Sequence, residues 1–200
     1  MKKVIGVILF IIAAIGIAVF KNITKENIKQ NSIQSALDSE TNKEEENLTN
    51  QNWFYNTQFG LVFETPKRIT ETNFPLPNGL QDYINNAYSY IFQDNDIAIN
   101  YLIMETKFKK YNTKEGLRGA ISNLMNYANG TNLQLDFYEV TNKYEDIGCT
   151  GTCLYKDITV KIKGYCLFKK SRVYILIATG QESTAFNKKL DRIFDSIKII

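Results

Sequence analysis

The most regular hydrophobic pattern in the chain lies between Thr152 and Ile200. From Ile158 to Phe168, apolar or small side chains fall on alternate positions, with Thr, Lys and Tyr side chains between them. Neighbouring side chains on a strand point to opposite faces, so this alternation predicts a strand with one buried face. The run Val173–Ala178 is apolar throughout apart from its tyrosine, which is typical of a strand covered on both faces. Two polar segments flank the Ile158–Phe168 strand and predict turns, Lys156-Asp157 before it and Lys169–Ser171 after it.

The last segment of the chain has the period of an amphipathic helix. Its apolar side chains recur at helical spacing and form one stripe: Phe186, Leu190, Ile193, Phe194 and Ile197. Ser183 or Thr184 can begin the helix by accepting a hydrogen bond from an otherwise unpaired backbone N–H. A strand that needs cover on both faces is thus followed at once by a helix with one apolar face. This order predicts a helix packed against a sheet.

The middle of the chain predicts further elements of both kinds. Strands are expected at Phe59–Phe63, Ile97–Phe108 and Leu133–Phe137 from their β-branched, aromatic or alternating content. A helix is expected between them, because Asn112 with Glu115 suits a helix start and Gly130 suits its exit. Its apolar stripe would consist of Leu117, Ala120, Ile121, Leu124 and Ala128.

Three segments are ambiguous. Leu80–Phe92 fits helical spacing but is rich in aromatic residues, so strand stays open and helix is favoured. Asn142–Thr150 is polar and predicts a loop. Asp94-Asn95-Asp96 resembles the start of a calcium loop, but no Gly and Glu follow at the required positions. A turn is therefore expected there.

The N-terminus predicts a membrane or export segment. Two lysines precede an uninterrupted apolar run, Val4–Phe20. The run is near the lower length limit for a membrane span, and we favour an uncleaved signal anchor. A cleaved signal peptide stays open, because Gly16–Ala18 has the small-x-small pattern of a cleavage site. We expect residues 1–20 to be this segment.

The chain after the apolar run predicts a stalk and one domain. Residues 21–52 are polar, without Pro or Gly, and predict a flexible stalk. Residues 53–200 would form one globular domain. Because lysines flank the apolar run on both sides, charge alone does not orient it. A short basic leader before an apolar run is typical of export signals, so we place the domain in the periplasm or at the cell surface, or secreted if the leader is cleaved.

Composition excludes several kinds of chemistry. The chain has no histidine, which excludes a Ser-His or Cys-His pair and any His-ligated zinc site. No glycine pattern matches a phosphate-binding or dinucleotide-binding loop. The net charge of +3 is too small to indicate nucleic-acid binding. We therefore predict no catalytic residue, no cofactor and no metal site.

The three cysteines have no redox or zinc spacing. Cys149 and Cys153 are separated by three residues, and Cys166 lies on the apolar face of its strand. A disulfide, with Cys149 and Cys153 as the candidate pair, three free thiols, and pairing with another molecule all stay open. Cys166 is expected to be a small buried apolar residue.

Two groups of residues are candidates for a partner surface. The first is the aromatic cluster Trp53, Phe54 and Tyr55 beside the stalk, for which core or edge packing is the alternative. The second is the basic cluster, whose members Lys107, Lys109 and Lys110 precede Lys114 and Arg118. A solvated strand end is the alternative for these lysines.

Two short motifs carry a family resemblance. Gln58–Pro66 (Gln-Phe-Gly-Leu-Val-Phe-Glu-Thr-Pro) and Ile193–Lys198 (Ile-Phe-Asp-Ser-Ile-Lys), in this order of elements, resemble the PsbP-like superfamily, which has DcrB-like bacterial envelope members. The resemblance covers residues 53–200. It implies an α+β fold, an antiparallel sheet with helices packed on both faces. It also implies a binding, chaperone or assembly role, and no site residue is carried over from it.

These observations predict a non-catalytic protein-binding or assembly module of the cell envelope. It would contact the membrane through its N-terminal helix and bind a protein partner that the sequence does not identify. The alternative is a small-molecule or lipid-binding domain in which Tyr and Phe side chains line a cavity. An enzyme would need two acidic residues converging in a cleft, and no pattern indicates such a pair.

Overall fold

The computed structural model describes residues 53–72, 82–141 and 145–200. The predicted membrane segment at 1–20 and the predicted stalk at 21–52 lie outside these residues. No helix in the described part of the chain combines the length and the hydropathy that crossing a bilayer requires.

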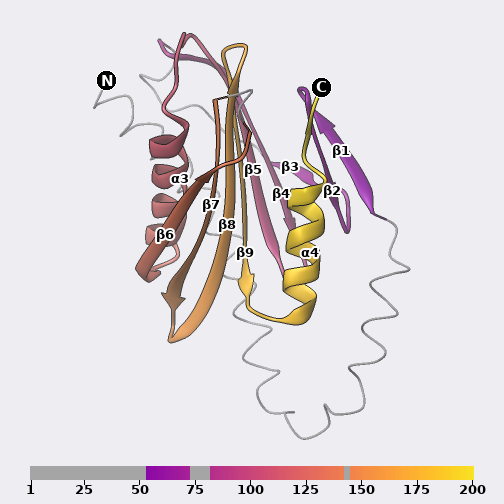
Figure 1. Ribbon diagram of the computed structural model, residues 1–200, viewed down its shortest axis with the longest axis vertical. Coiled ribbons are helices and arrows are strands. Elements are labelled where there is room, and N and C mark those ends of the chain that lie inside the picture. Colours follow the sequence, from indigo (N-terminus) through magenta and orange to yellow (C-terminus); the bar gives the residue numbers. More distant parts are fainter. Residues whose placement is uncertain (1–52, 73–81, 142–144) are drawn as a thin grey trace, which may run out of the picture.

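The described residues form two antiparallel sheets and two helices (Figure 1). The larger sheet has the strand order β3-β4-β5-β9-β8-β7-β6, and the smaller has the order β1-β2-β10. The strands of the larger sheet are β3 Thr70–Thr72, β4 Ile84–Gln93, β5 Ala98–Thr106, β6 Thr131–Glu139, β7 Glu145–Tyr155, β8 Ile158–Lys169 and β9 Arg172–Gln181. The remaining elements are β1 Phe54–Gln58, β2 Leu61–Thr65, β10 Lys198–Ile199, α3 Thr113–Tyr127 and α4 Thr184–Asp195.

The larger sheet separates two hydrophobic cores. On one face, α3 buries Leu117, Ile121 and Leu124 against Ile162 and Cys166 of β8. On the other face, α4 and the small sheet bury their side chains against β4, β5 and β9, with members such as Phe63, Tyr101, Leu176, Phe186 and Ile193. The predicted α+β architecture, an antiparallel sheet with a helix on each face, is confirmed. The small sheet is an additional feature that the sequence did not indicate.

The alternation from Ile158 to Phe168 is confirmed as β8. Ile162 and Cys166 face α3, whereas Tyr165 and Leu167 face the core that contains α4. Strand β9 is buried on both faces along Val173–Gly180, as its apolar run predicted. Positive φ angles of 46° and 65° at Lys156 and Asp157, and of 50° and 59° at Lys170 and Ser171, form the tight turns that join β7 to β8 and β8 to β9.

Both predicted helix starts are confirmed by their capping bonds. The Asn112 side chain accepts a hydrogen bond from the Glu115 N–H at 3.1 Å. The Ser183 hydroxyl accepts one from the Phe186 N–H at 3.0 Å. At the exit of α3 the residue with positive φ is Asn129, at 58°, rather than Gly130. Asn tolerates this conformation because its short polar side chain can bond locally.

Two predictions of local structure are wrong. The segment favoured as a helix at Leu80–Phe92 forms β4 from Ile84 onward, and Leu80 lies outside the described residues. Long antiparallel pairing with β5 outweighs its helical spacing. The loop predicted at Asn142–Thr150 instead forms β7 from Glu145 onward, between β6 and β8. Its small and polar side chains obscured the strand pattern, and positions 142–144 lie outside the described residues.

The Asp94-Asn95-Asp96 segment is a turn, as predicted, and it is held by a lysine. The Lys189 side chain, 8% exposed, places its Nζ 2.7 Å from Asp94 Oδ2 and 2.5 Å from Asp96 Oδ2. Asp94 also accepts hydrogen bonds from the N–H groups of Asp96 and Ile97. Both carboxylates thus pair with a cation of the protein, and this pairing ties α4 to the β4–β5 turn.

Candidate binding groove

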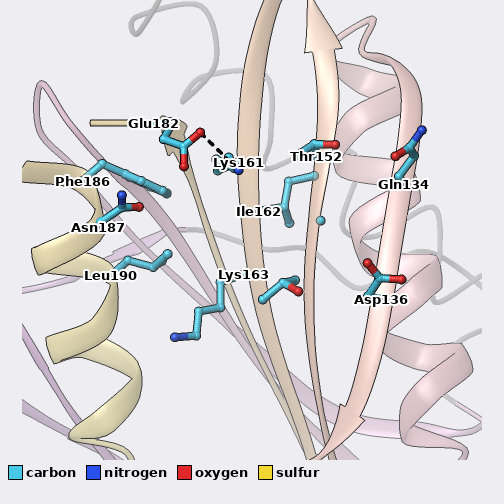
Figure 2. Close-up of a pocket in the computed structure, with 12 residues that line it drawn as sticks. Gln134, Asp136, Thr152, Lys161, Ile162, Lys163, Glu182, Phe186, Asn187 and Leu190 are labelled. Atoms are coloured by element: carbon cyan, nitrogen blue, oxygen red, sulfur yellow. Dashed lines mark ion pairs between the residues drawn. The ribbon is translucent and has the colours of Figure 1, made fainter. Parts of the chain in front are cut away.

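A groove lies between α4 and the outer strands of the larger sheet. Helix α3 packs on β6, β7 and β8 from one face, whereas α4 packs on β9 and on β2 of the small sheet. The α4-side face of β6 and β7, and of β8 near Lys161 and Lys163, is therefore left open beside the helix. Figure 2 shows this opening, with α4 on one side and the side chains of β6 and β7 on the other.

The first half of the groove is lined by both polar and apolar side chains and has a cavity volume of about 360 Å³. Thr152 and Asp136 line it from β7 and β6, and Asn187 lines it from α4 (Figure 2). Lys161 of β8 pairs with Glu182, with 3.2 Å between Nζ and Oε2. Because this pair is exposed to water, it contributes little stability and can exchange for a contact with a bound molecule.

The second half of the groove is more apolar and has a volume of about 390 Å³. Tyr138 and Val140 line its outer side and are 41% and 45% exposed. Phe194, Ile197 and Ile199 line its inner side, at the end of α4 and in the segment that follows. The Tyr138 ring lies directly on Gly148, where an added Cβ would approach a ring carbon to 2.4 Å. Glycine at this position therefore lets the tyrosine lie flat on the sheet.

Lys163 lies where the two halves meet. It lines both of them, and its side chain is 17% exposed. Its Nζ is 3.4 Å from Asp191 Oδ1 and 5.0 Å from the centroid of the Phe194 ring. The lysine stem covers apolar surface while the charge stays near a carboxylate and an aromatic face.

Hydrogen bonds to the buried carboxylate of Asp146 join β6, β7 and β8 at the apolar half of the groove. The Tyr165 hydroxyl donates to Asp146 Oδ2 at 3.2 Å. The backbone N–H of Thr141 donates to Asp146 Oδ1 at 3.1 Å. Asp146 is only 6% exposed, so these bonds satisfy a carboxylate that would otherwise be costly to bury. They hold the end of β6 and the start of β7 as one wall of the groove.

The predicted aromatic cluster lies on and beside β1, away from this groove. Phe54 and Tyr55 are 41% and 70% exposed. Trp53 is half-buried beneath the Arg192 guanidinium, with 4.2 Å between the guanidinium carbon and the ring centroid. Arg192 also donates to Glu64 at 2.8 Å. That hydrogen bond is the largest of the influences that lower the pKa of Glu64 below its usual range.

The predicted basic cluster lies on the connection between β5 and α3. Lys107, Lys109 and Lys110 are all exposed there. The neighbouring cations Lys114 and Arg118 lie over the Phe137 ring of β6, at 5.5 Å and 5.1 Å from its centroid. The structure does not bring the aromatic and basic clusters together, since Figure 1 places β1 and the start of α3 far apart.

The disulfide between Cys149 and Cys153 is not formed, and that interpretation of their spacing is wrong. Both residues lie on β7, four positions apart, which separates their Cα atoms by about 13 Å where a disulfide requires less than about 7 Å. All three cysteines are buried and free. Burial raises the pKa of Cys153 to about 11 and that of Cys149 to about 12.

The groove residues were not singled out from the sequence. Lys161, Lys163 and Tyr165 were recognised only as the side chains between the apolar positions of β8. Their alternation was the available signal, because it shows that this face of the strand carries polar and aromatic groups. What lies opposite them, α4 and the outer strands, could not be read from local sequence.

The described residues contain no cluster of three or more cysteine or acidic side chains that could hold a metal ion. The Glu105 carboxyl has a pKa below its usual range because Asn86 and then Arg172 donate hydrogen bonds to it. A carboxyl in this condition stays ionised and is poorly suited to donate a proton at neutral pH. Glu105 lies on β5, outside the groove. The lining of the groove itself offers charged side chains, amides and aromatic rings, which are groups suited to binding.

No protein-family model matches the sequence, and no curated protein matches it either. Several solved structures are similar in outline. The yeast Ran-binding protein Mog1p from Saccharomyces cerevisiae is 10% identical, with a TM-score of 0.48 over 74% of this chain and 96% of that one. Cyanobacterial PsbP from Synechocystis is 11% identical, with a TM-score of 0.48 over 74% and 92%.

LpqN from Mycobacterium tuberculosis, described as involved in cell envelope biogenesis, is 11% identical, with a TM-score of 0.42 over 74% of this chain and 90% of that one. A PsbP is thus among the solved structures that this chain resembles.

Proposed function

We propose that this chain is a non-catalytic protein-binding module, and that the groove between α4 and strands β6–β8 receives its partner. The observation that carries this proposal is the composition of the groove. Exposed apolar side chains and weakly paired charges line it side by side, and the described chain places no metal-binding cluster there. Such a mixture is typical of surfaces that bind other proteins.

The location is also proposed. The basic leader and apolar run at the N-terminus support a domain held at the membrane on its extracytoplasmic side. A polar tether would keep the groove close to that membrane, which raises the effective concentration of the module for partners there.

The rigidity of the groove supports binding over catalysis by a moving lid. Its floor is a strand pair, β7 and β8, in continuous register from Glu145/Phe168 to Tyr155/Ile158. Its wall, α4, is fixed near its middle by the Lys189 pairing with Asp94 and Asp96. A preformed surface loses little conformational entropy when a partner binds.

Site-specific photo-crosslinking in cells of the source organism tests the proposal. A photoreactive amino acid is placed in the full-length chain at Thr150 or Asn187, which are exposed within the groove. Matched control positions are Glu71 on β3 and Tyr127 at the end of α3, which are exposed elsewhere. We expect both groove positions to crosslink to the same protein and the controls not to do so.

A second measurement links the crosslink to the groove itself. Thr150→Trp fills the floor of the groove with a bulky ring and leaves the two cores untouched. We expect this variant to lose the crosslink at Asn187 while its thermal unfolding is unchanged. Equal crosslinking from groove and control positions, or full crosslinking in Thr150→Trp, would show that the groove is not the binding surface.

A further inference from the structure

We propose that the partner inserts an extended segment carrying a lysine or arginine and, about four residues away, an apolar side chain. This inference rests on the proposed function, because it names the chemistry of the segment that the groove receives. Three observations support it: the carboxylates along the groove that have no ion-pair partner, the apolar lining of the second half, and the distance between Asp136 and that apolar half.

The unpaired charge along the groove is negative. Its two lysines are already paired, Lys161 with Glu182 and Lys163 with Asp191. Asp136 on the β6 side and Asp195 on the α4 side are both exposed, and neither has an ion-pair partner among the described residues. The groove therefore carries two carboxylates without a counter-charge although the whole chain has a net charge of +3. A cationic segment complements this arrangement, and an acidic one is repelled by it.

The apolar end supplies the second element of recognition. Tyr138 and Val140 remain partly exposed across from Phe194, Ile197 and Ile199. An apolar or aromatic side chain of the partner, placed between these two sets of residues, would shield their exposed apolar surface from water. Anchors of this kind, surrounded by polar contacts, supply much of the binding energy in protein interfaces.

The geometry of β6 gives the spacing between the two elements. Asp136 lies on β6 and Val140 follows its last residue, four positions further on, which corresponds to about 13 Å in an extended chain. A segment running along the groove in extended form thus brings a cation to Asp136 when its apolar side chain, about four residues away, lies beside Val140. A helical segment places residues four apart within about 6 Å and does not span this distance.

Selection from a display library of short random peptides on the full-length chain in nanodiscs tests the inference. We expect the recovered peptides to be enriched in lysine or arginine about four residues from an aromatic or aliphatic residue, and depleted in acidic residues. Their affinity should fall roughly fivefold in Asp136→Asn, as for an exposed charge pair, and less in Asp195→Asn, because Asp195 lines the apolar half, away from the cation. The matched control Glu71→Gln removes an exposed carboxylate on β3 and should leave the affinity unchanged.

The possible results separate the two proposals. Peptides without a cation preference, or with affinity unaffected by Asp136→Asn, overturn the charge inference. If such peptides still lose binding in Thr150→Trp, the groove remains the binding surface and only its assigned partner chemistry is wrong. If peptides bind Thr150→Trp as tightly as the unaltered chain, or if none is recovered, both the inference and the groove assignment fail.

Discussion

Removing the buried Lys189 charge is the sharpest test of how α4 is held. In Lys189→Met the apolar stem is retained, and Asp94 and Asp96 lose the cation that lies between them. Hydrogen bonds to charged groups contribute about 1.5–3 kcal/mol each, and breaking a fully buried ion pair costs about 3–5 kcal/mol. The Asp94 and Asp96 side chains are 16% and 32% exposed, so water can hydrate them in the variant. We therefore expect a loss of about 2–3 kcal/mol in the free energy of unfolding.

The assay is urea unfolding followed by tryptophan fluorescence. The chain has one tryptophan, Trp53, and its ring lies beneath Arg192 of α4. Its emission therefore reports on the docking of the helix whose anchor is changed. Lys110→Met, at an exposed lysine on the connection between β5 and α3, is the control and should change stability by less than about 0.5 kcal/mol.

Two further measurements separate charge from packing. Replacing both carboxylates in the variant, by Asp94→Asn and Asp96→Asn, should recover part of the lost stability, since it removes the unpaired like charges. Burial alone would lower the Lys189 pKa, but the hydrogen bonds to Asp94 and Asp96 outweigh it and hold the pKa above its usual value. The stabilisation is then fully present below the unfolded lysine pKa of about 10.4 and is lost as the pH rises through the folded value. A Lys189→Met protein within about 0.5 kcal/mol of the unaltered chain at neutral pH would refute this reasoning.

Three other predictions concern the cores and a helix end. The thiols of Cys149 and Cys153 should react with an alkylating reagent at pH 8 only after denaturation, and rapid labelling of the native protein would contradict this. Burial raises their pKa to about 12 and about 11, so their contribution to the free energy of unfolding should be intact below about pH 8.5 and fall at higher pH, where the unfolded thiols ionise. Gly180→Ala should lower the free energy of unfolding, measured with a chemical denaturant, by about 3 kcal/mol, because its Cβ would lie 2.3 Å from a backbone oxygen. Gly164→Ala should lower it by only about 1–2 kcal/mol, because its nearest contact would be a side-chain sulfur at 2.9 Å, and the reverse order would be inconsistent with the packing. Asn112→Ala should cost about 1 kcal/mol by removing the cap of α3, whereas Asn112→Ser should retain most of it, and equal thermal stability of all three proteins would argue against the cap.

Elements whose identity depends on local pattern were predictable from the sequence. The alternation in β8, the apolar run in β9 and the stripe of α4 each record which side chains face a core, because strand and helix periods differ. Asn112 and Ser183 were predictable for the same reason, since a cap acts within three residues along the chain.

Elements whose identity depends on distant pairing were not predictable. β4 has apolar residues at helical spacing, and only its pairing with β5 along most of its length decides that it is a strand. The polarity of Asn142–Thr150 predicted a loop there, although β7 begins at Glu145 and contains Gly148 and Gly151. Those glycines are required by tertiary contacts, since the Tyr138 ring and the backbone oxygen of Gln134 occupy the positions their side chains would take.

The groove was decided entirely by the tertiary structure. Its lining comes from β6, β7, β8, α4 and the segment after α4, so no local window contains more than a part of it. The same holds for the ion triad, in which Lys189 lies 93 and 95 positions from its two partners. Sequence by itself determined which side chains of β8, β9, α3 and α4 face a core, because that choice follows from local periodicity. Which polar faces then meet across a groove follows from strand order and helix placement, and these are settled only when the whole chain packs.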